Sequence, residues 1–167
     1  LCARTGLKTI ALSLPIHQVA SQHSRAACHL AWLDDHFNNV ETAEIDLTAA
    51  FEAVRESLPA ETRDDHALAN ARARLRMLTL YAVASSRRLL VAGTGNKVED
   101  FGVGFFTKYG DGGVDLAPIA DLLKSEVRKV ARGLEIPGEI ADATPTDGLW
   151  DDARSDEDQI GASYDDL

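Results

Sequence analysis

The chain has 167 residues, 45% of them hydrophobic and 26% charged, a composition typical of one folded domain and unlike that of a disordered segment. Its 27 acidic and 17 basic side chains give a formal net charge of −10. This charge argues against a dedicated duplex-binding module, which needs a basic face for phosphates. No hydrophobic run approaches the ~20 residues that cross a bilayer, so no membrane-spanning helix is predicted.

The two cysteines and the two ends of the chain bear on its context. Cys2 and Cys28 fit neither a disulfide framework nor a four-ligand zinc site, and a reducing compartment, the cytoplasm, is the simplest interpretation. Residues 1–6 are typical of the last turn of a helix and its C-cap, and residues 163–167 begin another helix-like pattern. We therefore expect the chain to begin and end inside elements of a longer protein. No signal-peptide pattern is visible.

The first half of the chain predicts strands alternating with helices. Residues 8–14 are a short apolar run before a proline, which predicts a buried strand. Residues 23–37 carry apolar side chains at spacings of three and four, which predict an amphipathic helix. Residues 42–47 predict a second strand, and Thr48 is the expected cap of a helix that ends at Pro59.

The second half continues this alternation. After a polar loop over 60–65, we expect a long helix over 66–86 and a third strand over 89–93. A further helix is expected over 124–134. Strands and helices in this order predict an α/β fold with a parallel sheet and flanking helices. Ligands of such sheets bind beyond the carboxyl ends of the strands, so the turn after Val91 is the foremost expected site.

A glycine-rich segment, Gly104 to Asp115, is the most unusual stretch of the sequence. Its glycines permit close approach of a ligand, Lys108 can meet a phosphate or carboxylate, and Asp115 can accept hydrogen bonds from a ribose or an amine. An ordinary glycine-rich turn explains the composition equally well.

The segment Gly93 to Glu99 places a glycine turn at the end of the third predicted strand. Exposed N–H groups in such a turn suit a nucleotide, although the spacing of a Walker A loop is absent. Glu99 is a candidate metal ligand or a favourable carboxylate in the first turn of a helix.

Three arginines lie on the long predicted helix. Arg72 and Arg76 are four residues apart and share a face, and we expect Arg74 to point toward more buried positions. A buried arginine needs an anionic partner, which can be a protein carboxylate or a ligand phosphate. For Arg74 both partners stay open, whereas Arg72 is expected to be structural.

Other polar residues suggest no separate site. The five histidines form no metal-binding pattern, although His29 and His36 share one predicted helix. Neither cysteine has the surroundings of a nucleophile. The acidic stretch over 147–158 is expected to be a solvated, mobile loop.

Several segments, taken in order, resemble NAD synthetases. They are N-A-R-A-R-L-R-M, G-T-G-N-K-V-E, G-F-F-T-K-Y-G-D-G-G-V-D, P-T-D-G-L-W and D-E-D-Q-I-G-A-S-Y. The F-T-K-Y-G-D-G-G motif is close to diagnostic of the family and is most similar to the ammonia-dependent type. The G-T-x-N-x-x-E motif alone indicates the wider ATP-pyrophosphatase superfamily. The resemblance implies a Rossmann-like fold of that superfamily over residues 1–167, with its first strand missing from the chain.

This resemblance also implies an activity. ATP adenylates the carboxylate of deamido-NAD and releases pyrophosphate, and ammonia then displaces AMP to give NAD. ATP is thus a co-substrate, and Mg²⁺ is the implied metal, which neutralises charge on the pyrophosphate. The family is homodimeric, and an external glutaminase is one conceivable source of ammonia.

Site residues follow from the matching motif positions. Arg74, Lys108 and Asp115 match the family's contacts to deamido-NAD, and Thr94, Lys124 and Thr146 match its contacts to ATP. Glu99 matches the magnesium ligand, and Asp111 matches an aspartate that positions ammonia. Residues 144–164 match a loop that closes on substrates, which is a functional alternative to the solvated loop.

The chain departs from the family pattern at both ends. The family's S-G-G-x-D-S phosphate loop and its C-terminal His-Lys pair have no counterpart in residues 1–167. Residues 1–167 alone are expected not to turn over substrate. The alternative function is a catalytically silent fragment that only dimerises or binds a dinucleotide, and another ATP-pyrophosphatase is disfavoured by the glycine-rich segment.

Overall fold

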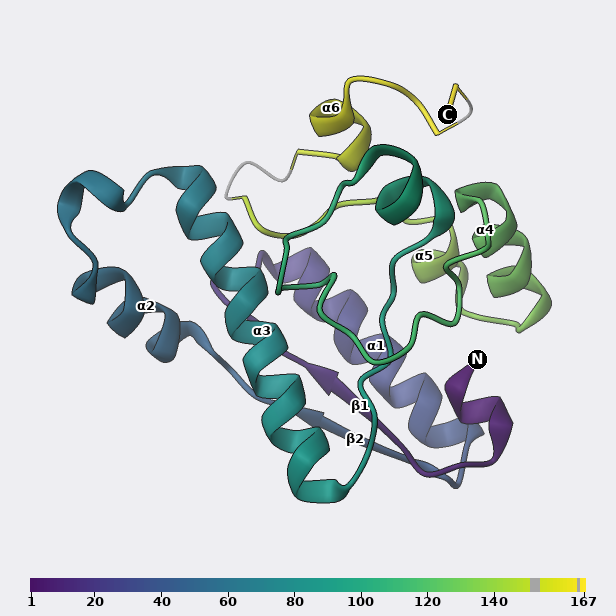
Figure 1. Ribbon diagram of the computed structural model, residues 1–167. Helices are drawn as coiled ribbons and strands as arrows, with labels where there is room; N and C mark the ends of the chain where they lie inside the picture. Colours follow the sequence, from purple (N-terminus) through teal and green to yellow (C-terminus); the bar gives the residue numbers. More distant parts are fainter. Residues whose placement is uncertain (151–153, 165) are drawn as a thin grey trace.

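The computed structural model describes residues 1–150, 154–164 and 166–167 (Figure 1). Two strands and a set of helices follow one another along the chain. The elements are η1 (Cys2–Thr5), β1 (Thr9–Ser13), α1 (Ala20–His36), β2 (Val40–Glu44), α2 (Thr48–Ser57), η2 (Ala60–Thr62), α3 (Asp65–Arg87), η3 (Lys97–Val103), α4 (Lys124–Gly133), α5 (Gly138–Ala141) and α6 (Asp156–Ile160).

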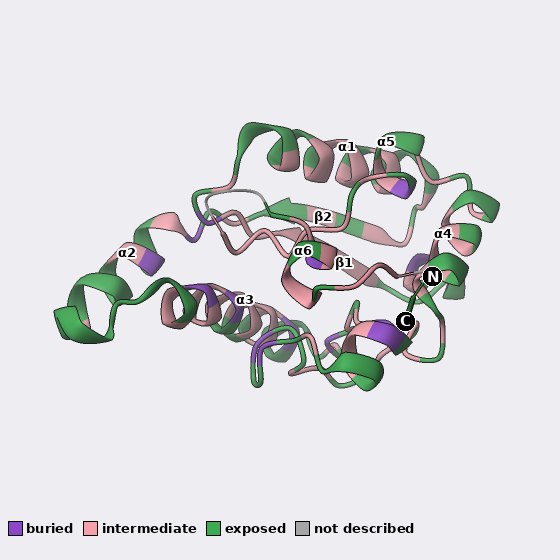
Figure 2. Ribbon diagram, turned by 90° about the horizontal axis from the view of Figure 1, so that it is seen from above, coloured by how far each residue is buried: buried purple, intermediate pink, exposed green. Residues whose placement is uncertain are grey.

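The sheet is parallel, as the alternation of elements predicts. β1 pairs with β2 in a register that places Thr9 opposite Val40 and Ser13 opposite Glu44, and α1 connects the two strands. Figure 2 shows α1 and α3 on opposite sides of the strands. The α/β class and the first two predicted strands are therefore confirmed, with boundaries shifted by one to three residues.

The predicted cap of α2 is wrong. The side chain of Thr48 does not cap the helix; instead, the Thr48 N–H donates to Asp46 Oδ1 at 2.8 Å, and Thr48 Oγ1 accepts from the His17 N–H at 3.3 Å. The side chain of Thr48 thus ties the loop after β1 to the start of α2. α3 matches its prediction; it begins at Asp65 and is capped by Asp64, whose Oδ1 accepts from the Ala67 N–H at 2.9 Å.

A small core lies where β1 and β2 end. Ile16, Leu47 and Phe51 are buried there together, at 1%, 7% and 1% exposure. Leu68 and Leu75 of α3 pack against them. This cluster fixes the carboxyl ends of both strands against α3, which is the part of the fold that positions a ligand site.

The third predicted strand, 89–93, is not formed. Only a single parallel bridge joins Ala92 to Leu116: the Gly93 N–H donates to the Leu116 carbonyl at 2.8 Å, and the Leu116 N–H donates to the Val91 carbonyl at 3.3 Å. The Val91 N–H donates to Asp115 Oδ2 at 2.8 Å, so a side chain replaces the next ladder bond. The segment is extended but has too few strand partners among the described residues.

β1 is also less buried than predicted. All five of its residues are only half-buried, although its sequence reads as an interior strand. The reason is that β1 pairs with β2 along one edge only, and the described sheet has two strands. Its other edge faces the segment 89–94 without a backbone hydrogen bond to it.

Candidate nucleotide and substrate site

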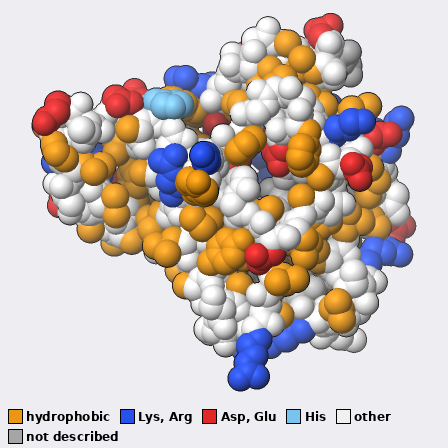
Figure 3. Space-filling model, in the orientation of Figure 1, with side chains coloured by type: hydrophobic (Ala, Val, Ile, Leu, Met, Phe, Trp, Pro, Cys, Tyr) orange, Lys and Arg blue, Asp and Glu red, His pale blue; other side chains and the backbone are white. Residues whose placement is uncertain are grey.

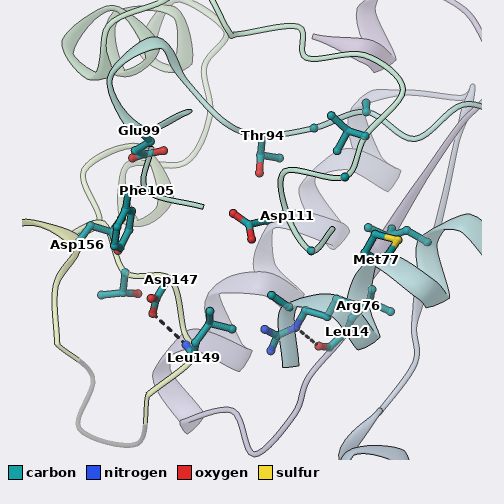
Figure 4. A pocket seen from close by; sticks show the side chains of 18 of the residues that line it. Leu14, Arg76, Met77, Thr94, Glu99, Phe105, Asp111, Asp147, Leu149 and Asp156 are labelled. Atoms are coloured by element: carbon teal, nitrogen blue, oxygen red, sulfur yellow. Dashed lines mark hydrogen bonds between the residues drawn. The ribbon is translucent and has the colours of Figure 1, made fainter. Parts of the chain in front are cut away.

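A cavity of about 590 Å³ lies beyond the carboxyl end of β1 (Figure 4). It is bounded by the end of β1, by α3, by the segments after Ala92 and after Gly104, and by the segment that leads to α6. Its polar lining residues are Arg76, Thr94, Glu99, Asp111, Lys124, Thr146, Asp147 and Asp156. The cavity occupies the edge of the sheet where parallel strands place ligands.

Five of the eight predicted site residues meet in this cavity. They come from four different segments of the chain and are Thr94, Glu99, Asp111, Lys124 and Thr146. Arg74, Lys108 and Asp115 are not among the residues that line it. The structure therefore brings together the positions matched to ATP, metal and ammonia, and separates them from the positions matched to deamido-NAD.

Glu99 and Lys124 form the charged centre of the site. Lys124 Nζ donates to Glu99 Oε1 at 2.7 Å, and their side chains are only 20% and 12% exposed. Desolvation opposes ionisation of Glu99, but hydrogen bonds from Lys124 and Tyr164 outweigh it and lower the pKa of Glu99. Glu99 is thus held as a carboxylate at neutral pH.

Asn96 positions Glu99. It is 1% exposed, and its Oδ1 accepts from the N–H groups of Val98 and Glu99 at 3.0 and 3.1 Å, which caps η3. The first turn of η3 therefore points the Glu99 side chain toward the cavity. Gly95, just before Asn96, lies against Asp100, whose carboxylate would have to move to make room for a Cβ atom.

Tyr164 connects the C-terminal segment to this centre. Its hydroxyl lies 2.5 Å from Glu99 Oε1 and 3.3 Å from Asp156 Oδ2, and its ring lies 5.0 Å from Lys124 Nζ. Burial and hydrogen bonding to Glu99 raise the pKa of Tyr164, so its hydroxyl stays protonated and donates.

Asp156 is a buried acid beside this network. The residue is 6% exposed, and its Oδ1 atom has no hydrogen-bond partner in the described part of the chain. Burial, together with the nearby negative charges of Glu99 and Asp147, raises the pKa of Asp156 to about 6, against the lowering effect of Lys124. An acid of this kind is typical of a functional site.

Asp147 fixes the segment that precedes α6. Its Oδ1 accepts from the Leu149 N–H at 3.0 Å, a bond drawn in Figure 4, and its Oδ2 accepts from Trp150 Nε1 at 3.2 Å and from Gln159 Nε2 at 3.1 Å. The prediction of a solvated loop over 147–158 is therefore wrong for Asp147, whose carboxylate is hydrogen-bonded within its own segment, and for Asp156, which is buried beside Glu99, Lys124 and Tyr164. Asp151 and Asp152 lie outside the described residues.

Asp111 points into the middle of the cavity (Figure 4). Its Oδ1 accepts from the Thr107 N–H at 2.9 Å, and Thr107 is in turn tied to Asn70 of α3 at 2.7 Å. Desolvation is the main cause that raises the pKa of Asp111, with the negative charges of Asp147 and Glu99 adding to it. The glycine-rich segment thus presents a fixed carboxyl group with an elevated pKa.

The predicted orientation of Arg74 is wrong. Arg74 is exposed, whereas Arg76 is half-buried and lines the cavity, where its Nε donates to the Leu14 carbonyl at 2.9 Å (Figure 4). Ala69 and Ala73 form the buried face of α3, and Arg76 lies three residues beyond Ala73 on that face. Arg74 is rotated away from it, and its Nε donates to the Lys108 carbonyl at 3.1 Å.

Asp115 and Lys108 lie outside the cavity. Asp115 accepts from the Val91 N–H and, at 3.2 Å, from the Tyr81 hydroxyl, so its carboxylate holds the extended segment against α3. Lys108 is exposed, and its ammonium lies 5.0 Å from the Tyr109 ring centre. Their predicted contacts to deamido-NAD remain predictions.

Several residues of the site are not predicted by any motif of the sequence. They are Arg76, Asn96, Asp147, Asp156 and Tyr164. An N-cap reading of Asn96 followed by Glu99 was available from the sequence. Arg76 reaches the cavity from the partly buried face of α3. The contacts of Asp147, Asp156 and Tyr164 depend on how the chain after Thr146 folds, for which no local pattern gives a signal.

No preformed metal cluster is present among residues 1–150, 154–164 and 166–167. His29 and His36 share α1 as expected, but His36 stacks on Trp32 with ring centres 4.5 Å apart. Cys2 and Cys28 are free thiols. Within the described chain no helix has both the length and the apolar character that a membrane crossing requires.

A parallel α/β fold whose polar cavity lies at the carboxyl ends of its strands is typical of nucleotide-binding enzymes. The family model described as NAD synthase matches residues 2–167 of this chain. The chain therefore belongs to the NAD synthase family, and the resemblance drawn from its sequence motifs is confirmed.

Individual relatives agree with this assignment. The NH₃-dependent NAD⁺ synthetase of Mesoplasma florum is 42% identical over 130 residues, which are 77% of this chain and 52% of that protein. Among solved structures, an NMN synthetase from Francisella tularensis has a TM-score of 0.85 at 36% identity, over 97% of this chain and 65% of that one. An NH₃-dependent NAD synthetase from Campylobacter jejuni has a TM-score of 0.69 at 29% identity, over 80% and 55%. The chain spans about half the length of the curated relatives it matches.

Proposed function

We propose that the protein carrying this chain is a carbon–nitrogen ligase that converts deamido-NAD to NAD with ATP and ammonia. The observation that carries the proposal is the convergence of Thr94, Glu99, Asp111, Lys124 and Thr146 on one cavity, in a chain of the NAD synthase family. Curated relatives are named NH₃-dependent NAD⁺ synthetases, which supports ammonia as the nitrogen donor.

The reaction has two steps. A carboxylate oxygen of deamido-NAD attacks the α-phosphorus of ATP, the bond to the bridging oxygen breaks, and pyrophosphate leaves. Ammonia then attacks the acyl carbon, AMP leaves with the carboxylate oxygen, and the amide nitrogen loses a proton. Activation is needed because a carboxylate is a poor electrophile that lacks a good leaving group, and adenylation supplies AMP as that leaving group.

The residues of the cavity suit these steps. Lys124 supplies a fixed positive charge for phosphate oxygens, and the hydroxyls of Thr94 and Thr146 supply hydrogen bonds. We expect Asp111 to hold ammonia and to accept a proton, and the raised pKa that desolvation gives its carboxyl group supports this role. The enclosure by the chain after Thr146 limits the access of water to an acyl-adenylate.

A magnesium ion fits the donor set of this cavity. Mg²⁺ prefers oxygen ligands and takes one or two protein carboxylates together with substrate phosphates and water. Glu99 is ionised, and the buried Oδ1 of Asp156 has no partner among the described atoms. When bound, the ion would neutralise charge on the pyrophosphate; Glu99 would hold it, and Asp156 is a second candidate.

A second candidate substrate is the mononucleotide counterpart of deamido-NAD. The Francisella tularensis NMN synthetase matches 97% of this chain at a TM-score of 0.85, against 80% and 0.69 for the Campylobacter jejuni NAD synthetase. The same cavity serves either substrate, since both carry the nicotinate carboxylate that is amidated.

Product analysis separates the candidates. The protein is incubated with ATP, Mg²⁺, ammonium and either deamido-NAD or deamido-NMN, and the products are identified by mass spectrometry. Formation of NAD with equimolar AMP and pyrophosphate is expected, and faster formation of NMN would favour the second substrate. A protein that binds the dinucleotide but forms neither product would match the silent-fragment alternative and refute the enzyme.

The proposal includes the oligomeric state, the cellular compartment and the ammonia source of the protein. We expect a homodimer in the cytoplasm, supplied with free ammonia or with ammonia from an external glutaminase. Figure 3 shows hydrophobic side chains on the face formed by α3 and the glycine-rich segment. Leu78, Phe106 and Tyr109 are 60%, 43% and 66% exposed, which supports a subunit contact there.

A further inference from the structure

A row of polar side chains runs from α3 to the segment before α6. Arg76 Nη2 donates to Gln18 Oε1 at 3.1 Å, and Gln18 Nε2 donates to Gln22 Oε1. Gln22 Nε2 in turn donates to Thr146 Oγ1 at 3.0 Å. Gln18 lies just before α1 and Gln22 in its first turn, so three separate parts of the chain are joined. We call these four side chains the amide relay.

Arg76 sets the direction of every bond in the relay. A guanidinium only donates hydrogen bonds, so the side-chain oxygen of Gln18 has to face it. The NH₂ group of Gln18 then faces the oxygen of Gln22, and the NH₂ group of Gln22 faces Thr146. The opposite orientation of either amide would place two donors or two acceptors against each other.

This direction decides what the Thr146 hydroxyl does. A hydroxyl has one proton to donate and two lone pairs that accept. Gln22 uses a lone pair of Oγ1, so the hydroxyl proton is directed away from Gln22. Within the described part of the chain this hydroxyl donates no hydrogen bond, and Thr146 lines the site cavity. The relay therefore leaves Thr146 as a donor for a ligand in that cavity.

The surroundings of the relay hold it in place. Arg76 is also anchored through Nε, which donates to the Leu14 carbonyl at 2.9 Å (Figure 4). Gly148 has a left-handed backbone conformation and lies over the two amides: a Cβ atom there would come within 2.9 Å of Gln18 Nε2 and 3.4 Å of Gln22 Oε1. The backbone at Gly148 therefore covers both glutamine side chains, which are half-buried.

The two glutamines are not themselves part of the cavity wall. Arg76 and Thr146 line the site cavity, whereas Gln18 and Gln22 line only a neighbouring cavity of about 390 Å³. A ligand in the site cavity is therefore within reach of Thr146 but not of the glutamines. Gln18 and Gln22 act on such a ligand through the Thr146 hydroxyl.

We propose that Gln18 and Gln22 are positioning residues which, with Arg76, fix the Thr146 hydroxyl as a donor to a phosphate oxygen of ATP. This inference rests on the proposed function, in which Thr146 contacts ATP. Hydrogen bonds to an ionised acceptor are roughly twice as strong as neutral ones. A donor that is already oriented needs no reorganisation when the phosphate arrives.

Reversing one bond of the relay tests the proposal. Gln22→Glu puts a carboxylate, which only accepts, beside Thr146, so the Thr146 hydroxyl donates to it and turns away from the ligand. The Kd for ATP with Mg²⁺, measured by calorimetry on the protein, is expected to rise at least tenfold. Ser21→Glu adds the same charge at an exposed position of α1 and is expected to change this Kd less than about twofold.

A double-mutant cycle separates positioning from a structural role. Thr146→Val removes the hydroxyl and keeps the shape of the side chain, and Gln22→Met removes the relay bond without adding charge. Gln22→Met alone is expected to raise the Kd for ATP about fivefold, and to leave it unchanged in the Thr146→Val background. A glutamine that touched ATP directly, or that only supported the fold, would weaken binding equally in both backgrounds.

Amide exchange in the ligand-free protein tests the relay without ATP. The side-chain NH₂ protons of Gln22, followed by NMR, are expected to exchange with solvent more slowly than those of the exposed Asn38. Thr146→Val is expected to remove part of this protection.

Two results would overturn the proposal: equal effects of Gln22→Met in both backgrounds, and Gln22 amide protons that exchange as fast as those of Asn38. Absence of ATP binding by the unaltered protein would instead refute the proposed function and phosphate as the ligand. Amide exchange would then still decide whether the relay orients Thr146.

Discussion

Replacing Asp156 by Asn tests the electrostatics of the site. Burial raises the pKa of Asp156 from 3.8 to about 6, which means that folding favours its protonated form. This preference is fully present below pH 3.8 and is lost as the pH rises through about 6. This pKa difference corresponds to about 3 kcal/mol, so above about pH 6 the ionised carboxylate lowers the free energy of unfolding by about that amount.

Asparagine has the same shape and carries no charge. Asp156→Asn is therefore expected to raise the free energy of unfolding at pH 7.5 by up to about 3 kcal/mol and to leave it nearly unchanged at pH 4. The assay is urea denaturation followed by tryptophan fluorescence, with a chelator present because a divalent cation would offset the cost of the charge. A matched control is Asp158→Asn on the same short helix.

The control substitution is expected to change stability in the opposite direction. Asp158 is exposed, and hydrogen bonds from Ser155 lower its pKa. Asp158→Asn is therefore expected to lower stability at neutral pH and to have little effect in acid. A decrease in stability at pH 7.5 for Asp156→Asn, or an equal change at both pH values, would refute the electrostatic argument.

Further substitutions separate structural residues from ligand contacts. Asn96→Ala is expected to lower the free energy of unfolding by about 1–2 kcal/mol and to reduce activity, because the cap that orients Glu99 is lost. Asn96→Asp keeps the oxygen acceptor and is expected to restore most of the stability. Unchanged stability in Asn96→Ala would contradict the role of Asn96 as a cap. Asp115→Asn is expected to destabilise the fold by about 1–3 kcal/mol in denaturant titrations, because the substitution weakens the hydrogen bond to the Val91 N–H. Unaltered stability together with a raised KM for the dinucleotide would show that Asp115 contacts the substrate instead. Lys108→Ala, at an exposed position, is expected to change stability by less than about 0.5 kcal/mol and to raise the KM for deamido-NAD; unchanged kinetics would remove Lys108 from the site.

Much of the fold could be predicted from local patterns. The spacing of apolar residues gave α1 and α3 to within three residues, and β1 and β2 followed from short apolar runs. The segment 89–93 has the same local pattern as a strand, but a strand also needs partners, and among the described residues only Leu116 pairs with it. Pairing is a property of the whole sheet, so this failure could not be predicted from the segment itself.

The site was predictable where motifs carried it. Thr94, Glu99 and Asp111 belong to segments with distinctive sequence motifs, and all three line the cavity. The prediction for Arg74 is wrong because Ala69 and Ala73 define the buried face of α3, and Arg74 is rotated away from that face. Tyr164 was not found, because its contact with Glu99 joins positions 65 residues apart that no local spacing relates.

Isotope labelling tests the central claim most directly. Deamido-NAD labelled with ¹⁸O in its nicotinate carboxylate is incubated with the protein, ATP, Mg²⁺ and ¹⁵N-ammonium, and AMP and the dinucleotide are analysed by mass spectrometry. The account predicts one ¹⁸O atom in AMP and one ¹⁵N atom in NAD. NAD formed without ¹⁸O in AMP, or ATP cleaved to ADP and phosphate, would contradict it.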